Sequence, residues 1–255
     1  KNGYAVKLID VSSDALKKGV VTINKNLDRL IKKEKISIID KENTLKNIST
    51  YTNISEAISD VDLVIEAATE NEKIKLEIFK TLDQHCPSNT ILASNTSSIS
   101  ITKIASVTNR PDKVIGMHFM NPVPIMKLVE IIRGYSTSIE VCEQIEALSL
   151  ELEKVPVLVN DAPGFVANRI LMPMINEAII TLQEGVAGVN EIDTIMKLGM
   201  AHPMGPLQLA DFIGLDVCLS ILKVLHDGLG NQKYAPSPVS YTHLRAHETR
   251  HDPVC

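Results

Sequence analysis

Short apolar runs alternate with amphipathic stretches along roughly the first 160 residues of the chain. Residues 5–10, 62–67 and 90–94 are rich in Val, Ile, Leu and Ala, which is typical of buried strands. Residues 13–35 place apolar side chains every three or four positions, which predicts a helix. This alternation predicts an α/β fold with a doubly wound parallel sheet covered on both faces. Further helices are expected over 73–85, 101–108 and 138–152, and further strands over 114–119, 127–132 and 155–159.

The pattern changes near residue 160, where the turn-forming stretch Asn160-Asp-Ala-Pro-Gly164 follows the last expected strand. Beyond it, up to about residue 229, the sequence shows helical periodicity and no convincing strand. We therefore expect a first domain over 1–160 and an all-helical second domain over 161–238. The clearest helical stretches of the second domain are 170–184 and 217–229.

The last segment, residues 239–255, differs in character from the rest of the chain. It holds three of the seven histidines, His243, His247 and His251, at a spacing that would put them on one helical face. Such a tract can form a metal site. The segment lacks apolar periodicity, so we favour the alternative of an unstructured tail, foreign to the native protein, and expect no metal site.

Composition limits the classes of partner. Of the 255 residues, 44% are apolar and 22% are charged, and the net charge is −5. This charge argues against broad electrostatic binding to nucleic acid or to an anionic membrane. The apolar runs are also shorter than the ~18 residues that a membrane helix needs. The four cysteines show no metal-binding spacing and suit a reducing compartment, so we expect a cytoplasmic protein.

The stretch GMHFMNPVPIMKLVEII, residues 116–132, predicts an apolar hairpin with two prolines at its turn. His118 lies in its first apolar run and Glu130 interrupts the second. A hairpin can bring these residues face to face on neighbouring strands. Histidine titrates near neutrality and can serve as an acid or a base, and a nearby carboxylate fixes its tautomer. The alternative is a core histidine with a glutamate on the solvent side of an edge strand.

Asp10 ends the first expected strand. An acidic residue in this position of a dinucleotide-binding unit bonds the adenosine ribose, ~20 residues after a glycine-rich turn. The sequence contains no GxGxxG motif. Either the sheet binds no dinucleotide, or the glycine turn precedes residue 1. In the second case we expect the chain as given to bind NAD poorly, because backbone amides of that turn hold the pyrophosphate.

Residues 3 to about 238 resemble the short-chain 3-hydroxyacyl-CoA dehydrogenases. The resemblance implies a Rossmann-like NAD-binding domain over 1–160, with its first strand and glycine turn missing, and a helical substrate and dimerisation domain over 161–238. It implies a homodimer that oxidises (S)-3-hydroxyacyl-CoA to 3-oxoacyl-CoA with NAD, with 3-hydroxybutyryl-CoA as the expected substrate, within fatty acid or butyrate metabolism. The matching stretches are residues 93–101, 116–132, 160–179 and 199–216.

The resemblance also implies roles for individual residues. His118 is the expected catalytic acid and base, Glu130 its partner, Ser97 a contact of substrate and cofactor, and Asn168 a group near the substrate carbonyl. By the residues alone, Ser97 could instead cap a helix and Asn168 could be a surface amide. The cofactor side is implied for Asp10, Glu70, Lys75, Ser97 and Asn121, and the CoA moiety for Asn26 and Lys33.

Two other functions remain compatible with the residues. One is a β-hydroxyacid dehydrogenase that acts on free acids with a lysine catalyst, which the pairing of His118 with Glu130 disfavours. The other is a non-catalytic binding or structural protein built on the same scaffold. For Glu70, Lys75 and Lys33, the competing interpretation is a solvated charged surface.

Overall fold

The computed structural model describes residues 2–238, so the tail with His243, His247 and His251 lies outside the described residues. The chain divides into two units. Unit 1 contains the chain up to Thr96 together with Ile101–Asn160. Unit 2 contains the short segment Ser97–Ser100 and the chain from Asp161 onward.

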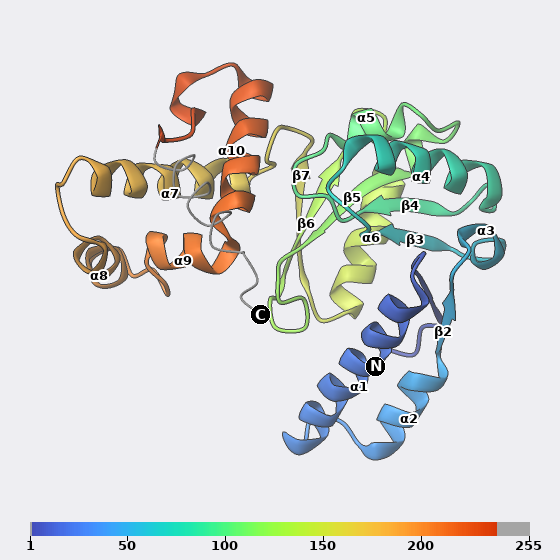
Figure 1. Cartoon of the computed structure of the whole chain (residues 1–255). Helices are drawn as coiled ribbons and strands as arrows, with labels where there is room; N and C mark the ends of the chain where they lie inside the picture. Colours follow the sequence, from blue (N-terminus) through green and yellow to red (C-terminus); the bar gives the residue numbers. More distant parts are fainter. Residues whose placement is uncertain (1, 239–255) are drawn as a thin grey trace, which may run out of the picture. The chain divides into compact units, whose positions relative to one another are not determined.

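A five-stranded sheet with the order β3-β4-β5-β6-β7 forms the centre of unit 1 (Figure 1). β3, β4 and β5 run parallel, β6 runs antiparallel to β5, and β7 runs parallel to β6. The sheet is thus mixed. Strand–helix alternation predicted an all-parallel sheet, whereas the hairpin predicted over 116–132 accounts for the antiparallel pair, because the short connection between β5 and β6 permits no other. The strands are β3 (Leu63–Glu66), β4 (Ile91–Ser94), β5 (Val114–Phe119), β6 (Leu128–Arg133) and β7 (Val155–Asn160).

Helices cover both faces of this sheet. α4 and α5 connect the parallel strands β3, β4 and β5 and lie on one face, whereas α6 connects β6 to β7 and lies on the other (Figure 1). This follows from the preference for right-handed crossovers, because β6 and β7 run opposite to the first three strands. The helices are α4 (Glu72–His85), α5 (Ile101–Ala105) and α6 (Ile139–Glu151), with the short turn η1 (Pro111–Lys113) before β5.

The amino-terminal part of unit 1 forms a separate parallel pair of strands, β1 and β2. Within the described residues, β1 pairs only with β2 and β3 pairs only with β4. The sequence pattern did not predict α2, β2 or α3, because residues 36–58 are largely polar and their elements are short. The elements here are β1 (Val6–Ile9), α1 (Ser13–Lys32), α2 (Ile38–Lys46), β2 (Ile48–Tyr51) and α3 (Ile54–Ala57).

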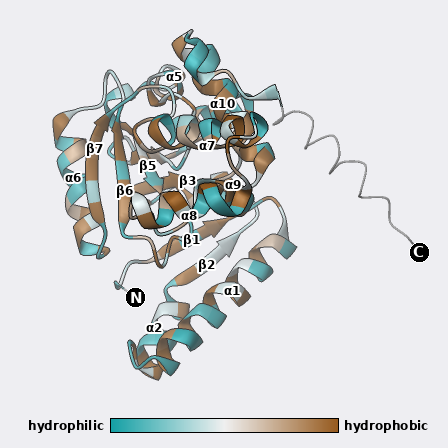
Figure 2. Cartoon of the chain, turned by 90° about the vertical axis from the view of Figure 1, so that its left-hand side faces the viewer, coloured by the Kyte–Doolittle hydropathy of each residue, from teal (hydrophilic) through white to brown (hydrophobic). Residues whose placement is uncertain are grey.

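The strand β6 consists largely of apolar residues, whereas helices such as α6 alternate apolar and polar residues along their length (Figure 2). One cluster joins the strands β4, β5 and β6 to α6 and is fully buried at Ile115, Met117 and Ile131. Because β5 and β6 are central strands, nearly all of their residues are buried, polar ones included. A charged side chain placed on these strands must therefore find its partner inside the protein.

Up to residue 238, unit 2 is helical, with a core formed by apolar residues of four α-helices. Asp193 on α8 accepts hydrogen bonds from the amides of Leu207 and Gln208 and so caps the start of α9. The predicted fold class, a Rossmann-like α/β domain followed by a helical domain, is confirmed. The helices are α7 (Ala167–Gln183), α8 (Val189–Gly199), α9 (Pro206–Ile213) and α10 (Leu215–Leu229), followed by η2 (Gln232–Tyr234).

Candidate functional site

The hairpin of β5 and β6 places His118 directly opposite Glu130. Opposite residues of an antiparallel pair project to the same face of the sheet. Nδ1 of His118 lies 2.8 Å from Oε2 of Glu130, and both residues are buried, with 6% and 3% of their surface exposed. An ionised carboxylate can only accept, so this bond puts a proton on Nδ1. The alternative of a solvent-facing glutamate on an edge strand is wrong, because β6 lies between β5 and β7.

Two contacts fix the position of this pair in the hairpin. Asn95, just after β4, accepts a hydrogen bond from the amide of Phe119 through its side-chain oxygen at 2.8 Å. Two residues before His118, Gly116 lies opposite Ile132, and a Cβ at Gly116 would come within 2.7 Å of Cβ of Ile132. The close approach of the strands therefore requires glycine at this position.

A second group of charged residues lies at and beyond the carboxyl end of β3. Lys75 is 1% exposed, and its Nζ lies 2.7 and 2.9 Å from the two oxygens of Glu66. Glu70 lies 3.8 Å from the same Nζ, and its carboxylate accepts a 2.6 Å hydrogen bond from Thr96. A solvated position for Lys75 is therefore wrong. Sequence reasoning missed Glu66, because a glutamate ending a strand gives no sign of its burial.

Asp10 and Asn121 both lie at the ends of strands and are exposed. Asp10 follows β1, and its carboxylate accepts a 2.8 Å hydrogen bond from the amide of Ser12, the cap of α1. Asn121 opens the turn between β5 and β6, three residues after His118. Asp10 thus presents a carboxylate at the carboxyl end of a parallel strand, where ligands of such sheets bind.

Ser97 and Asn168 belong to unit 2 and contact one another. The side-chain amide of Asn168 donates a hydrogen bond to the carbonyl of Ser97 at 3.2 Å, and Asn168 is buried. The alternative of a surface amide at Asn168 is therefore wrong. Gly164 has a φ of +70° and leaves no room for a side chain against Leu225, which fixes the entry into α7.

Asn26 and Lys33 lie on the first helix of the chain. Asn26 is half-buried within α1, and the exposed Lys33 forms its carboxyl-terminal cap. Of the other predicted site residues, Asp10 alone lies near them in sequence, just before α1. Exposure leaves the ammonium of Lys33 available to an anionic ligand, but it is equally the environment of an ordinary surface lysine.

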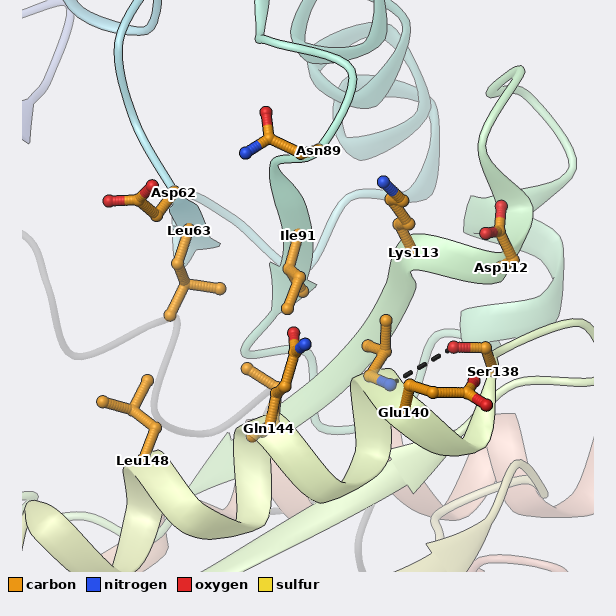
Figure 3. Close-up of a pocket in the computed structure, with 12 residues that line it drawn as sticks. Asp62, Leu63, Asn89, Ile91, Asp112, Lys113, Ser138, Glu140, Gln144 and Leu148 are labelled. Atoms are coloured by element: carbon orange, nitrogen blue, oxygen red, sulfur yellow. Dashed lines mark hydrogen bonds between the residues drawn. The ribbon is translucent and has the colours of Figure 1, made fainter.

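A pocket of about 480 Å³ lies at the opposite end of the sheet, where β3, β4 and β5 begin (Figure 3). Leu63, Ile91 and Leu148 contribute apolar side chains, and Ser138 lies on its rim as the cap of α6. None of the predicted site residues lines this pocket. Ligands of open α/β sheets bind at the carboxyl ends of the strands, so we do not assign the chemistry here.

The described cysteines do not supply a nucleophile. Cys86, Cys142 and Cys218 are buried free thiols. Burial raises the pKa of all three, that of Cys218 to about 11, so each stays protonated at neutral pH. Across residues 2–238, no cluster of His, Cys, Asp or Glu side chains could hold a metal ion. The helices of this part of the chain also lack the length and apolar character needed to cross a membrane.

Two sequence profiles match the chain almost end to end. Residues 1–162 match the family described as "3-hydroxyacyl-CoA dehydrogenase, NAD binding domain". Residues 164–252 match the one described as "3-hydroxyacyl-CoA dehydrogenase, C-terminal domain". Together the two profiles account for both units.

Individual proteins give the same result. A "Probable 3-hydroxybutyryl-CoA dehydrogenase" of Bacillus subtilis (strain 168) is 54% identical over 96% of this chain and 85% of its own. The mitochondrial "Hydroxyacyl-coenzyme A dehydrogenase" of Homo sapiens is 43% identical over 92% of this chain and 77% of its own. The crystal structure of (S)-3-hydroxybutyryl-CoA dehydrogenase PaaH1 from Ralstonia eutropha superposes with a TM-score of 0.93 at 50% identity, covering 96% of this chain and 87% of its own.

The packing of Gly116 against Ile132 yields a test of the hairpin. Gly116→Ala should lower the free energy of unfolding by about 1–3 kcal/mol, because the new methyl group overpacks two central strands. Urea denaturation followed by circular dichroism measures the change. Gly19→Ala is the matched control, since its Cβ would meet only Leu8 at an ordinary 3.6 Å within α1. A Gly116→Ala variant as stable as the parent would contradict the close approach of β5 and β6.

Proposed function

The chain belongs to the 3-hydroxyacyl-CoA dehydrogenase family of NAD-dependent oxidoreductases, and we propose that its substrate pair is (S)-3-hydroxybutyryl-CoA and acetoacetyl-CoA. The four-carbon acyl group is suggested by the names of the bacterial relatives, which are 50–54% identical to this chain. The observation that carries the catalytic part of the proposal is the buried 2.8 Å hydrogen bond between His118 and Glu130.

His118 acts in this proposal as the acid and base of the reaction. Oxidation of a secondary alcohol removes the hydroxyl proton and a hydride from the carbon that bears it. NAD, when bound, supplies the hydride acceptor. Because Nδ1 of His118 is engaged with Glu130, Nε2 takes the hydroxyl proton. The carboxylate of Glu130 stabilises the imidazolium that results, and in the reverse direction the imidazolium returns the proton to the ketone oxygen.

Ser97 and Asn168 are proposed to position the substrate. A hydroxyl and an amide can each donate a hydrogen bond to a carbonyl oxygen, and donors aimed at that oxygen favour its partial negative charge. The hydrogen bond from Asn168 to the carbonyl of Ser97 supports a joint role, since it restrains both residues within unit 2. Ser97 is further proposed to contact the cofactor.

The residues at the carboxyl ends of the strands fit a nicotinamide dinucleotide. The exposed carboxylate of Asp10 is suited to accept hydrogen bonds from ribose hydroxyls. Glu70, Lys75 and Asn121 are proposed to act on the nicotinamide side, with Lys75 acting through its carboxylate neighbours because it is buried. Most of these residues carry carboxylate or amide groups. Carboxylates accept hydrogen bonds from hydroxyls, and amides can pair with a carboxamide, so the residues suit the groups of such a cofactor.

Asn26 and Lys33 are proposed to contact the CoA moiety. The phosphates of CoA are anionic, and a lysine holds phosphate as a point charge. Lys33 is exposed, and the stretch Lys32-Lys33-Glu34-Lys35 holds three lysines and one glutamate, so the end of α1 carries a local positive charge. We place the reaction in the cytoplasm, in keeping with the free thiols of the described cysteines.

Unit 2 is proposed to form a homodimer. Its helix α9 contacts both α8 and α10, and each of the three helices leaves large apolar side chains exposed. Exposed apolar side chains in such number favour a protein interface. They are Ile195 and Leu198 on α8, Phe212 on α9, and Val217 and Val224 on α10.

Substitution of His118 tests the catalytic proposal. In the longest form of the protein that its gene encodes, His118→Gln should lower kcat for acetoacetyl-CoA reduction by about two to four orders of magnitude. Glu130→Gln should act in the same direction with a smaller loss, because the imidazole stays while its stabilising charge is lost. NADH consumption measures both. The exposed His85 offers the matched control His85→Gln, and activity of His118→Gln within a few-fold of the parent would remove His118 from this role.

Cofactor choice tests the assignment of Asp10. The parent should use NADH in preference to NADPH by at least about tenfold in kcat/KM, because the Asp10 carboxylate repels a 2′-phosphate. Asp10→Ser should reduce this preference, because it lowers kcat/KM for NADH and removes the repulsion of the 2′-phosphate of NADPH. Equal or better use of NADPH by the parent would contradict the assignment.

Sedimentation equilibrium tests the dimer. The parent should sediment with twice the mass of one chain, and Leu198→Lys combined with Phe212→Lys should give a monomer, because buried unpaired lysines oppose association. Ile38→Lys on α2 of unit 1 is the matched control, since Ile38 is equally apolar and exposed. A parent that sediments as a monomer, or a dimer unaffected by both lysines, would contradict an interface on these helices.

A further inference from the structure

Glu66 is a buried carboxylate with four hydrogen bonds at the carboxyl end of β3. One oxygen accepts from the amide of Ala68 at 2.7 Å and from Lys75 at 2.9 Å. The other accepts from Lys75 at 2.7 Å and from the hydroxyl of Ser94 at 2.8 Å. Ser94 is its register partner on β4, so the carboxylate is held by both strands. A buried charge needs such compensation, and here each oxygen has two donors.

Lys75 joins Glu66 to Glu70. It lies in the second turn of α4, and its ammonium group is buried between the two carboxylates. Its side chain is 2% exposed, that of Glu66 is 3% exposed, and that of Glu70 is 44% exposed. The inner pair is therefore shielded from water, whereas the outer carboxylate faces it. A lysine buried in this way cannot reach a bound ligand without losing its inner partner.

The charges of the three residues add to one negative charge. The inner pair of Glu66 and Lys75 is neutral, so the excess charge resides on Glu70. Thr96, just beyond β4, donates a 2.6 Å hydrogen bond to the Glu70 carboxylate, which therefore bridges the segments that follow β3 and β4. An oriented carboxylate at this edge is suited to accept hydrogen bonds from hydroxyl or amide N–H donors of a ligand.

We propose that Glu66 is a positioning residue for cofactor binding, which holds Lys75 and through it orients the exposed carboxylate of Glu70 toward the hydroxyl or carboxamide donors of the nicotinamide nucleotide. This inference rests on the proposed function. Without the charge of Glu66, Glu70 is the remaining carboxylate within ion-pair distance of Lys75 among the described residues. The buried ammonium then draws Glu70 inward, because an unpaired buried charge is costly. The ligand loses its acceptor although Glu70 itself is unchanged.

The competing account is an ion pair that only stabilises unit 1. It predicts that Glu66→Gln lowers the stability of the fold. It also predicts that any loss of NADH affinity is the same whether or not Glu70 is replaced. Glutamine has nearly the shape of glutamate and can still accept from Ser94 and Lys75, so the substitution removes charge with little change of packing. Thermal unfolding monitors stability in every variant.

Fluorescence titration with NADH measures the proposed effect, in the longest form of the protein that its gene encodes. Glu66→Gln should raise Kd for NADH by at least about tenfold. At saturating NADH its kcat should stay within about threefold of the parent, because His118 and Glu130 are unchanged. The exposed Glu77 on the same helix gives the matched control Glu77→Gln, for which we expect the parental Kd.

A double-mutant cycle with Glu70→Gln separates the two accounts. If Glu66 acts through Glu70, the double variant should bind NADH no more weakly than Glu70→Gln alone. The inference would be overturned if the rises in Kd for NADH of the two single variants multiplied in the double variant. It would also be overturned if Glu66→Gln had the parental Kd. If Glu66→Gln does not fold, Ser94→Ala replaces it in the cycle, since it removes one hydrogen bond from Glu66 and keeps all charges. Its rise in Kd should be about two- to threefold and should likewise vanish in the Glu70→Gln background.

The same titration distinguishes failure of this inference from failure of the proposed function. A parent that binds no NADH would overturn both. A parent that binds NADH, with a Glu66→Gln loss that persists in the Glu70→Gln background, would overturn the positioning role alone and leave the dehydrogenase proposal intact.

Discussion

The candidate site depends on the register between β5 and β6. In this register His118 stands opposite Glu130, and their side chains meet at 2.8 Å on one face of the sheet. A slip of one residue would move Glu130 to the other face, because side chains alternate along a strand. Gly116 and Asn95 restrain that register from either side of His118, one by allowing close approach and the other by bonding the next amide.

The two buried carboxylates of the candidate site, Glu130 and Glu66, follow one rule, that a charge on a buried strand must be paired inside the protein. Glu130 meets an imidazole, and Glu66 meets an ammonium and a hydroxyl. The two pairs differ in the basic side chain that meets the carboxylate, which is an imidazole in the first pair and an ammonium group in the second. Histidine can gain and lose a proton near neutrality, so the first pair suits proton transfer. The second pair places a lysine between two carboxylates, so it suits orientation of a neighbouring group.

Much of the fold could be predicted because its signals are local. The hairpin is predicted by the apolar runs at 114–119 and 127–132 and by the prolines between them. β5 begins and ends at the predicted residues. The partnership of His118 with Glu130 follows from strand pairing alone. Their roles in catalysis, like those of the other predicted site residues, stay predictions because they depend on a substrate and a cofactor.

Other features depend on contacts that no local pattern reports. The stretch TENEKIK, residues 69–75, is highly charged and indicates a solvated helix start, yet Lys75 is buried because Glu66 ends the adjacent strand. Ser97–Ser100 follows β4 in sequence but belongs with unit 2, where Asn168 contacts it. In both cases a residue's environment is set by partners nine or more positions away. The informative signal is therefore a charged residue at the carboxyl end of a buried strand. Burying an unpaired charge is costly in free energy, so such a residue requires a polar partner nearby. Its position also indicates the edge of the sheet where ligands bind.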